Sequence, residues 1–158
     1  MATRWLSKEQ QRAWRAYIEA VRLLQDSLDA QLQADAGMPH AYYEILVRLS
    51  ETPGRRLRMA ELATGTQSSR SRVSHAVARL EERGWVRREP CENDRRGQNA
   101  VLTDEGFAAL AAAAPGHVAQ VRTAVIDALS PAQLRALADA SATIADAVRA
   151  SEEQTGPG

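Results

Sequence analysis

Residues 68–84 read SSRSRVSHAVARLEERG, and the organisation of the whole chain can be worked out from this segment. Its apolar residues recur at i, i+3, i+4 and i+7, the spacing of one helical stripe: Val73, Ala76, Val77 and Leu80. Ser69 suits an N-cap, and Gly84 suits the position just past a helix, where a left-handed backbone is common. The segment therefore predicts one amphipathic helix with a buried stripe.

The opposite face of this helix carries hydroxyl, imidazole and guanidinium groups. Such groups hydrogen-bond to base edges and phosphates, and the N-terminus of the helix attracts anions through its free N–H groups and its dipole. We therefore predict that this face contacts DNA. Its residues are Ser69, Arg70, Ser71, Arg72, Ser74, His75 and Arg79.

A second short helix is predicted upstream, over Arg58–Ala63, with Met59, Leu62 and Ala63 turned inward and an end near Gly65. Two short helices joined by a turn of a few residues are typical of a helix-turn-helix. Arg58, at the start of this helix, joins the predicted DNA contacts.

Two short strands are predicted downstream, over residues 85–88 and 100–102, with a polar turn at 92–97 between them. This hairpin would be a wing with Asp94, Arg95 and Arg96 at its tip, all three predicted to take part in DNA binding. The alternative is a solvated loop without function. The fold class expected is mainly α with a small β-hairpin wing: a winged helix-turn-helix plus a helical dimerisation platform.

The sequence resembles the MarR-type regulators from about Ser7 to Val148. The resemblance rests on Asp94-Arg95-Arg96 followed by VLTDEG at 101–106, and on RLEERGWVRR at 79–88. It implies that Arg96 enters the minor groove of DNA while Asp94 orients it. It also implies that a small molecule, often phenolic, binds between the dimer platform and the winged lobe and releases DNA.

The two ends of the chain supply long, alanine-rich amphipathic helices over residues 7–36 and 104–150. Ser7 and Gln10 form a capping-box pattern, Ser130 opens the last helix, and Pro115-Gly116 is expected to kink or break the helix that contains it. A first helix of nearly thirty residues needs more cover than one chain offers, so we expect a homodimer. The alternative is a monomeric helical bundle. Residues 1–158 would then form one MarR-like domain around a DNA-binding lobe at 55–103.

A two-fold dimer would set its recognition helices about 34 Å apart and bind a pseudo-palindromic operator in double-stranded DNA. The net charge of zero argues against nucleic acid at first. However, residues 48–96 hold twelve arginines against seven acidic residues, a local charge of +5. The positive charge is therefore concentrated in the predicted DNA-binding segment.

An effector site is predicted where aromatic residues gather in the first two helices. Tyr43, with His40 one turn earlier, is offset from the apolar face of its helix, and Trp14 and Tyr17 lie on the long first helix. Aromatic walls with a few polar tips suit a small aromatic or phenolic ligand. The alternative is that Trp14, Tyr17 and Tyr42 only fill the apolar stripes of these helices.

Catalysis finds little support in the sequence. The three histidines fall in different elements without metal-ligand spacing, and no glycine loop could cradle a phosphate, so we expect no metal, no cofactor and no enzyme. No apolar run is long enough for a membrane helix, no signal peptide opens the chain, and Cys91 is the only cysteine, which favours the cytoplasm.

The function predicted is therefore that of a dimeric, sequence-specific transcriptional repressor released by an effector. The alternative is a winged-helix protein-interaction module without specific DNA binding. The outward face of the recognition helix discriminates between the two, because a protein-binding face should be apolar or acidic. Here that face carries arginine, serine and histidine.

Overall fold

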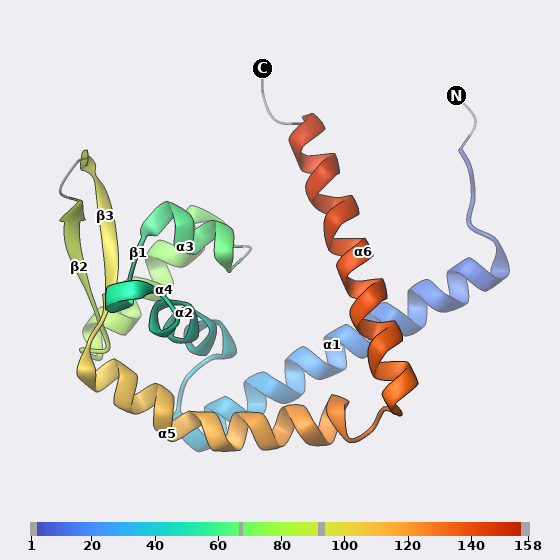
Figure 1. Ribbon diagram of the computed structural model, residues 1–158, viewed down its shortest axis with the longest axis horizontal. Coiled ribbons are helices and arrows are strands. Elements are labelled where there is room, and N and C mark those ends of the chain that lie inside the picture. The colour runs from blue at the N-terminus through green and yellow to red at the C-terminus, as the bar shows by residue number, and fades with distance from the viewer. Residues whose placement is uncertain (1–2, 67, 92–93, 156–158) are drawn as a thin grey trace. The chain divides into compact units, whose positions relative to one another are not determined.

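The computed structural model describes the backbone of residues 3–66, 68–91 and 94–155. It confirms the fold class, since helices predominate and the strands form one small antiparallel sheet (Figure 1). The elements are, in order, α1 (Lys8–Ala36), α2 (His40–Ser50), the 3₁₀ turn η1 (Pro53–Arg55), β1 (Arg56–Arg58), α3 (Met59–Gly65), α4 (Arg70–Glu82), β2 (Val86–Cys91), β3 (Asp94–Leu102), α5 (Asp104–Val121), the π-helical turn η2 (Arg122–Ile126) and α6 (Pro131–Thr155). The chain divides into two compact units, Met1–Val118 and Ala119–Gly158.

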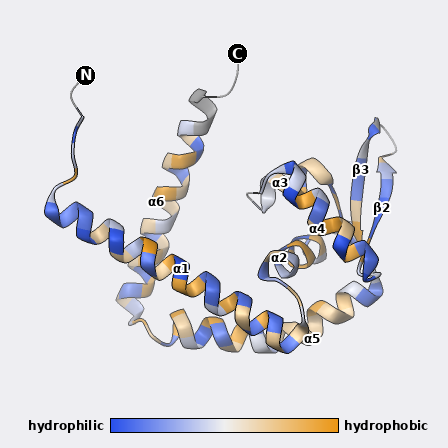
Figure 2. Ribbon diagram, turned by 180° about the vertical axis from the view of Figure 1, so that it is seen from behind, coloured by the Kyte–Doolittle hydropathy of each residue, from blue (hydrophilic) through white to orange (hydrophobic). Residues whose placement is uncertain are grey.

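The first helix begins and ends where its capping residues predict. Ser7 accepts a hydrogen bond from the backbone N–H of Gln10, whose side chain accepts one from Ser7 in return, and Gly37 ends the helix with φ of +59°. The helix has 29 residues, about 43 Å of length, yet only Leu28 and Leu32 are buried. Hydrophobic positions nevertheless recur along its whole length (Figure 2).

The core of the first unit lies between α2, α3, α4 and the sheet. The predicted stripe of α4 is buried as expected, and it packs with leucines of α2 and α3 and with the inward residues of β2 and β3. Tyr43 also belongs to this core with 7% exposure, whereas Tyr42 is half-buried. The most deeply buried side chains are Leu32, Met38, Leu46, Leu49, Leu62, Val77, Leu80 and Val86.

The sheet has three strands in the order β1-β3-β2, one more than predicted. β1 pairs Arg56 with Val101 and Arg58 with Asn99. Its sequence, Arg-Leu-Arg, is too short to show a significant alternation of polar and apolar residues, so this strand was not predicted. The hairpin strands are also longer than predicted, and β3 begins at Asp94, so the arginine pair lies in a strand and not in a loop.

Of the two outcomes expected at Pro115-Gly116, a kink or a break, the break does not occur, because α5 continues to Val121. A Cβ at Gly116 would lie 2.9 Å from Asp35 Oδ2 and 3.1 Å from Gln31 Nε2. At Gly116, therefore, α5 packs closely against side chains of α1. We attribute the continuity of the helix to this packing, which compensates for the backbone hydrogen bond that Pro115 cannot donate.

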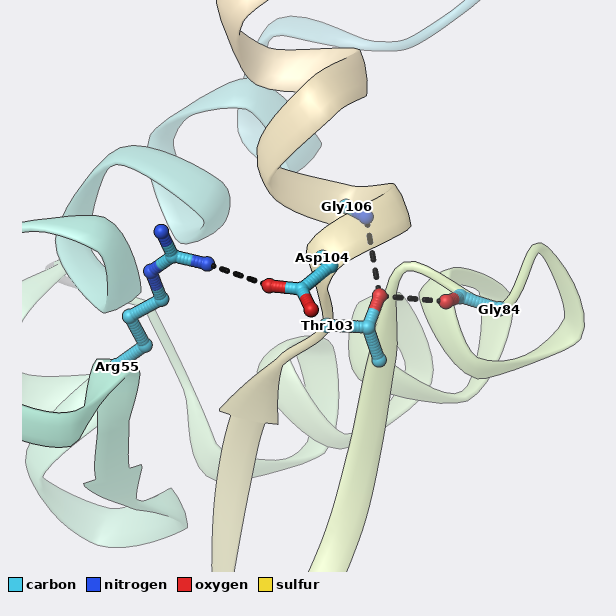
Figure 3. A network of polar contacts seen from close by, with 5 residues as sticks. All are labelled: Arg55, Gly84, Thr103, Asp104 and Gly106. Atoms are coloured by element: carbon cyan, nitrogen blue, oxygen red, sulfur yellow. Dashed lines mark hydrogen bonds and ion pairs between the residues drawn. The ribbon is translucent and has the colours of Figure 1, made fainter.

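One threonine joins the wing to both flanking helices (Figure 3). Thr103 Oγ1 donates a hydrogen bond to the carbonyl of Gly84, just past α4, at 2.7 Å, and accepts one from the N–H of Gly106 in α5 at 3.0 Å. The backbone N–H of Thr103 bonds to the Trp85 carbonyl at 3.0 Å. Arg55 adds an ion pair to Asp104 at 3.0 Å. Thr103 thus caps the N-terminus of α5.

Gly106→Ala should destabilise the protein, because a Cβ there would overlap the carbonyl oxygen of Trp85 and crowd Leu102. We expect a loss of about 1–3 kcal/mol, the usual cost of overpacking, in the free energy of urea unfolding. Gly65→Ala is the matched control, since its Cβ would meet Arg48 only at ordinary contact distance, 3.7 Å. Equal stability of the two variants would contradict the prediction.

Candidate nucleic-acid interface

The N-terminal half of α4 presents its polar face to solvent. Ser69 caps the helix by accepting a hydrogen bond from the N–H of Arg72 at 3.2 Å, as predicted. The buried stripe fixes which side chains face outward. Those exposed on the outer face are Arg70, Ser71, Arg72, Ser74, His75 and Arg79, all of them predicted contacts.

A groove of about 400 Å³ runs between the start of α3, α4 and the beginning of β3. It brings together five of the predicted residues from three separate stretches of sequence: Arg58, Arg70, Ser74, Asp94 and Arg96. Gln98 also lines the groove, and it was not predicted because its place depends on the pairing register of β3. Ser71, Arg72, His75 and Arg79 do not line this groove, although they share the exposed face of α4.

The carboxylate of Asp94 makes two contacts at the start of β3 in the wing. Asp94 Oδ1 accepts a hydrogen bond from the backbone N–H of Arg96 at 3.0 Å, and its Oδ2 lies 3.6 Å from Arg58 Nη1 in an ion pair. Asp94 therefore holds the main chain of Arg96 and links β3 to β1. The Arg96 side chain is exposed. The predicted contribution of Arg95 rests on a side chain outside the described part of the structure.

Most arginines of the lobe are neutralised by partners. Arg79 pairs with Glu82 at 2.9 Å, and the hydrogen bond and charge of Glu82 raise the pKa of Arg79. Arg56 and Arg87 share Glu89 at 3.2 and 2.8 Å. Within the described side chains, three arginines of the exposed α4 and wing surface have no ion-pair partner: Arg70, Arg72 and Arg96. The unpaired positive charge thus lies where the DNA contacts were predicted.

A second cavity, of about 780 Å³, contains two of the four predicted effector residues, His40 and Tyr43. The ring of His117, from α5, lies 4.3 Å from the Tyr43 ring and 5.5 Å from the His40 ring, measured between centroids. Arg48 and Thr66 also line the cavity. The sequence could not reveal His117, because 73 residues separate it from Tyr43 and no pattern connects the two helices.

The other two predicted effector residues lie elsewhere. Trp14 and Tyr17 form a tilted ring pair at 6.3 Å on the first half of α1, and 56% of Trp14 is exposed. Trp14 stands fifteen residues, about 22 Å of helix, before Asp29, whose carboxylate accepts a hydrogen bond from the His40 N–H at 2.8 Å. Within one chain, therefore, the four residues do not form one site.

Burial shifts the pKa of two ionisable groups of the cavity, those of Tyr43 and His117. It raises the pKa of the Tyr43 hydroxyl, because the phenolate would lose hydration. It lowers the pKa of His117, and the neighbouring His40 lowers it further. The imidazole Nδ1 of His117 is buried and has no hydrogen-bond partner. The rings of His117 and Tyr43 thus lie in contact within the wall of this cavity, and burial disfavours the charged form of both groups.

The described residues hold no group of three or more histidine, cysteine, aspartate or glutamate side chains that could bind a metal ion. Over the same residues, no helix is both long and apolar enough to span a membrane. Cys91 is buried at the end of β2, next to the turn of the hairpin, where its thiol donates to Asn99 Oδ1 at 3.2 Å.

Comparison with known proteins gives one consistent picture. The model of the MarR family matches residues 36–97. Sco3205 from Streptomyces coelicolor, described as a MarR family transcriptional regulator and solved in complex with DNA, is 58% identical over 92% of this chain and 91% of its own, with a TM-score of 0.89. AbsC, a MarR family transcriptional regulator from the same organism, is 48% identical over 94% of this chain and 99% of its own, with a TM-score of 0.88.

Among curated proteins, the transcriptional regulator PecS of Dickeya dadantii is 39% identical over 72 residues. The match covers 46% of this chain and 41% of PecS, so the chain aligns with less than half of that relative's length.

Acid should destabilise the protein through His117. Its folded-state pKa lies below the ordinary value of 6.5, so the unfolded chain binds the proton first and stability falls as the pH drops below about 6.5. His117→Gln cannot take up that proton and should lose less unfolding free energy between pH 7 and pH 5, measured in urea. His75→Gln, on the exposed face of α4, is the control. A His117→Gln protein as acid-sensitive as the wild type would refute the assignment.

Proposed function

The chain belongs to the MarR family of transcriptional regulators, and we propose that it is a homodimeric repressor that binds a pseudo-palindromic operator and leaves it when a small aromatic or phenolic effector binds. The observation that carries the proposal is the groove between α3, α4 and β3, which gathers Arg58, Arg70, Ser74 and Arg96 from three stretches of sequence.

The chemistry of this surface supports contact with duplex DNA. An exposed helix with short hydroxyl and guanidinium groups fits the major groove, where base edges present donors and acceptors. We propose that Arg96, which is exposed and lines the groove beside this helix, enters the neighbouring minor groove. The similar Sco3205 was solved with DNA bound, which supports DNA binding by this chain.

A second copy of the chain is proposed as the partner of the terminal helices. The first two thirds of α1 leave Trp14, Tyr17 and Ile18 substantially exposed, and α6 exposes Leu137, Ile144 and Val148. Apolar side chains spaced along two long helices favour association, and a two-fold dimer would match successive major grooves on one side of DNA.

The cavity of His40, Tyr43 and His117 is the proposed effector site. Its aromatic rings could stack on a planar ligand, the free Nδ1 of His117 could hydrogen-bond to a phenol, and Arg48 could pair with an acidic group. A ligand here would contact α2 and α5 and favour a spacing of recognition helices that no longer fits the operator. Trp14 and Tyr17 do not line this cavity, so any contribution of theirs to effector release would come from the exposed surface of α1.

The alternative, a winged-helix module that binds protein, has less support. It would require an apolar or acidic outer face on α4, and that face carries arginine, serine and histidine. The first test is therefore DNA binding by the purified protein to duplexes selected from a random-sequence library.

Arg96→Ala should weaken binding to the selected operator by about 1–3 kcal/mol, because the variant loses a guanidinium placed for the minor groove. Wild-type affinity should fall steeply with salt, since arginines displace condensed counterions. Arg149→Ala, which removes the same charge from the exposed surface of α6, is the control and should bind normally. Both proteins should sediment as dimers. An Arg96→Ala protein with wild-type affinity would exclude the wing from recognition.

Tyr43→Phe should weaken the response to effector without changing DNA affinity in its absence, because only the hydroxyl is removed from the cavity wall. The measurement is release of operator by a panel of benzoic acids and phenols, followed alongside quenching of tryptophan fluorescence. Tyr17→Phe, on the exposed pair of α1, is the matched control. If Tyr17→Phe alone changed the response, the site would belong on α1.

A further inference from the structure

Arg88 of β2 reaches the recognition helix at two points. Its Nη2 donates to the backbone carbonyl of Ser74 at 2.7 Å and lies 3.5 Å from the Ser74 hydroxyl. Its Nε lies 3.3 Å from Glu81 Oε2 in an ion pair, and its backbone N–H donates to Glu81 Oε1 at 3.0 Å. Arg88 of the wing thus contacts α4 at two residues that are seven positions apart, Ser74 and Glu81.

We propose that Arg88 and Glu81 form a positioning pair that fixes the recognition helix against the wing and thereby determines how selectively the protein reads DNA sequence. This inference rests on the proposed DNA-binding function and deepens it. Neither residue is proposed to touch a base.

The geometry makes this pair a rigid connection. Ser74 and Glu81 are two helical turns apart, about 10 Å along α4, so contacts at both points resist tilting as well as sliding of the helix. The contacts are charge-assisted and partly shielded, because the Arg88 and Glu81 side chains are only 26% and 34% exposed. The pair of Arg79 and Glu82 is also charge-assisted, but its side chains are more exposed and both residues lie within α4, so this pair does not connect α4 to the wing.

The position of the pair explains why it would affect specificity. Ser74 lines the protein groove between α3, α4 and β3, together with Arg70 and Arg96. The shorter contact of Arg88 is with the Ser74 carbonyl, at 2.7 Å, so Arg88 sets where the main chain of Ser74 lies relative to the wing, while its contact with the Ser74 hydroxyl is long, at 3.5 Å. Base readout requires donors and acceptors placed within hydrogen-bond distance, whereas phosphate attraction tolerates displacement. A loosened helix should therefore lose selectivity more than total affinity.

The neighbouring Arg87 provides a matched control. It lies on the same strand, carries the same charge and points to the other face of the sheet, and its ion pair is with Glu89 of its own strand instead of with α4. Arg87→Met and Arg88→Met therefore change net charge equally. Only the second removes the connection to the recognition helix.

The experiment uses the full-length protein and two duplexes: one selected by the wild type from a random-sequence library, and one of random sequence. We expect Arg88→Met to lower affinity for the selected duplex about tenfold more than affinity for random DNA. Arg87→Met should lower both by the same factor. The salt dependence of Arg88→Met should stay within experimental error of wild type, because no phosphate contact is lost.

Two milder variants keep the test valid if Arg88→Met unfolds. Glu81→Gln preserves the acceptor for the Arg88 N–H but removes the ion pair, and Arg88→Lys keeps the charge but cannot bridge both points. Both should fall between wild type and Arg88→Met in selectivity. Combining Glu81→Gln with Arg88→Met should add little to Arg88→Met alone.

The results distinguish the inference from the function on which it rests. If wild type enriches no sequence from the library, the proposed function fails and the inference fails with it. If wild type binds selectively but Arg88→Met and Arg87→Met lose the same factor on both duplexes, the inference alone is overturned. A salt slope reduced by about one in Arg88→Met would also overturn it, since that marks a phosphate contact.

Discussion

The hydroxyl of Thr103 connects three elements of the first unit, because it follows β3 and hydrogen-bonds to the end of α4 and to the start of α5. It donates to Gly84, where the recognition helix ends, and accepts from Gly106, where α5 begins. A side chain at Gly106 would collide with the Trp85 carbonyl, so in the short Thr-x-x-Gly segment the threonine is explained by its hydrogen bonds and the glycine by steric exclusion. The wing lies between these two helices in sequence. Its orientation, and that of α4, therefore follow from one local hydrogen-bonding network.

Local chemistry made much of the fold predictable, and long-range pairing set the limit. The caps at Ser7, Ser69 and Ser130 lie within three residues of the groups they bind, and each was found as expected. The apolar stripe of α4 was equally readable. By contrast, β1, the contact of His117 with Tyr43, and the close approach at Gly116 each depend on a partner more than forty residues away. No periodicity in the sequence encodes such partners.

In the candidate interface, too, local features could be predicted from the sequence, and features that depend on distant partners could not. Residue type and helical face indicated which side chains are polar and outward on α4. Their electrostatic state was not readable, because it depends on pairing across the sheet: two arginines from different strands share Glu89, and Glu81 engages Arg88. The local charge of +5 counted from sequence therefore does not show which arginines are left without an acidic partner. What remains unpaired in the described lobe lies chiefly on α4 and the wing.

The exposure of α1 has a consequence for the lifetime of the protein in a cell. A helix whose first twenty residues lack tertiary cover is marginally stable in water, and frayed helices are preferred substrates for proteases. If a second copy supplies that cover, then newly made chains at low concentration are degraded sooner than assembled ones. Its abundance would then respond more than proportionally to the rate of its synthesis. Such a threshold would let a cell switch the protein on or off with a modest change in expression.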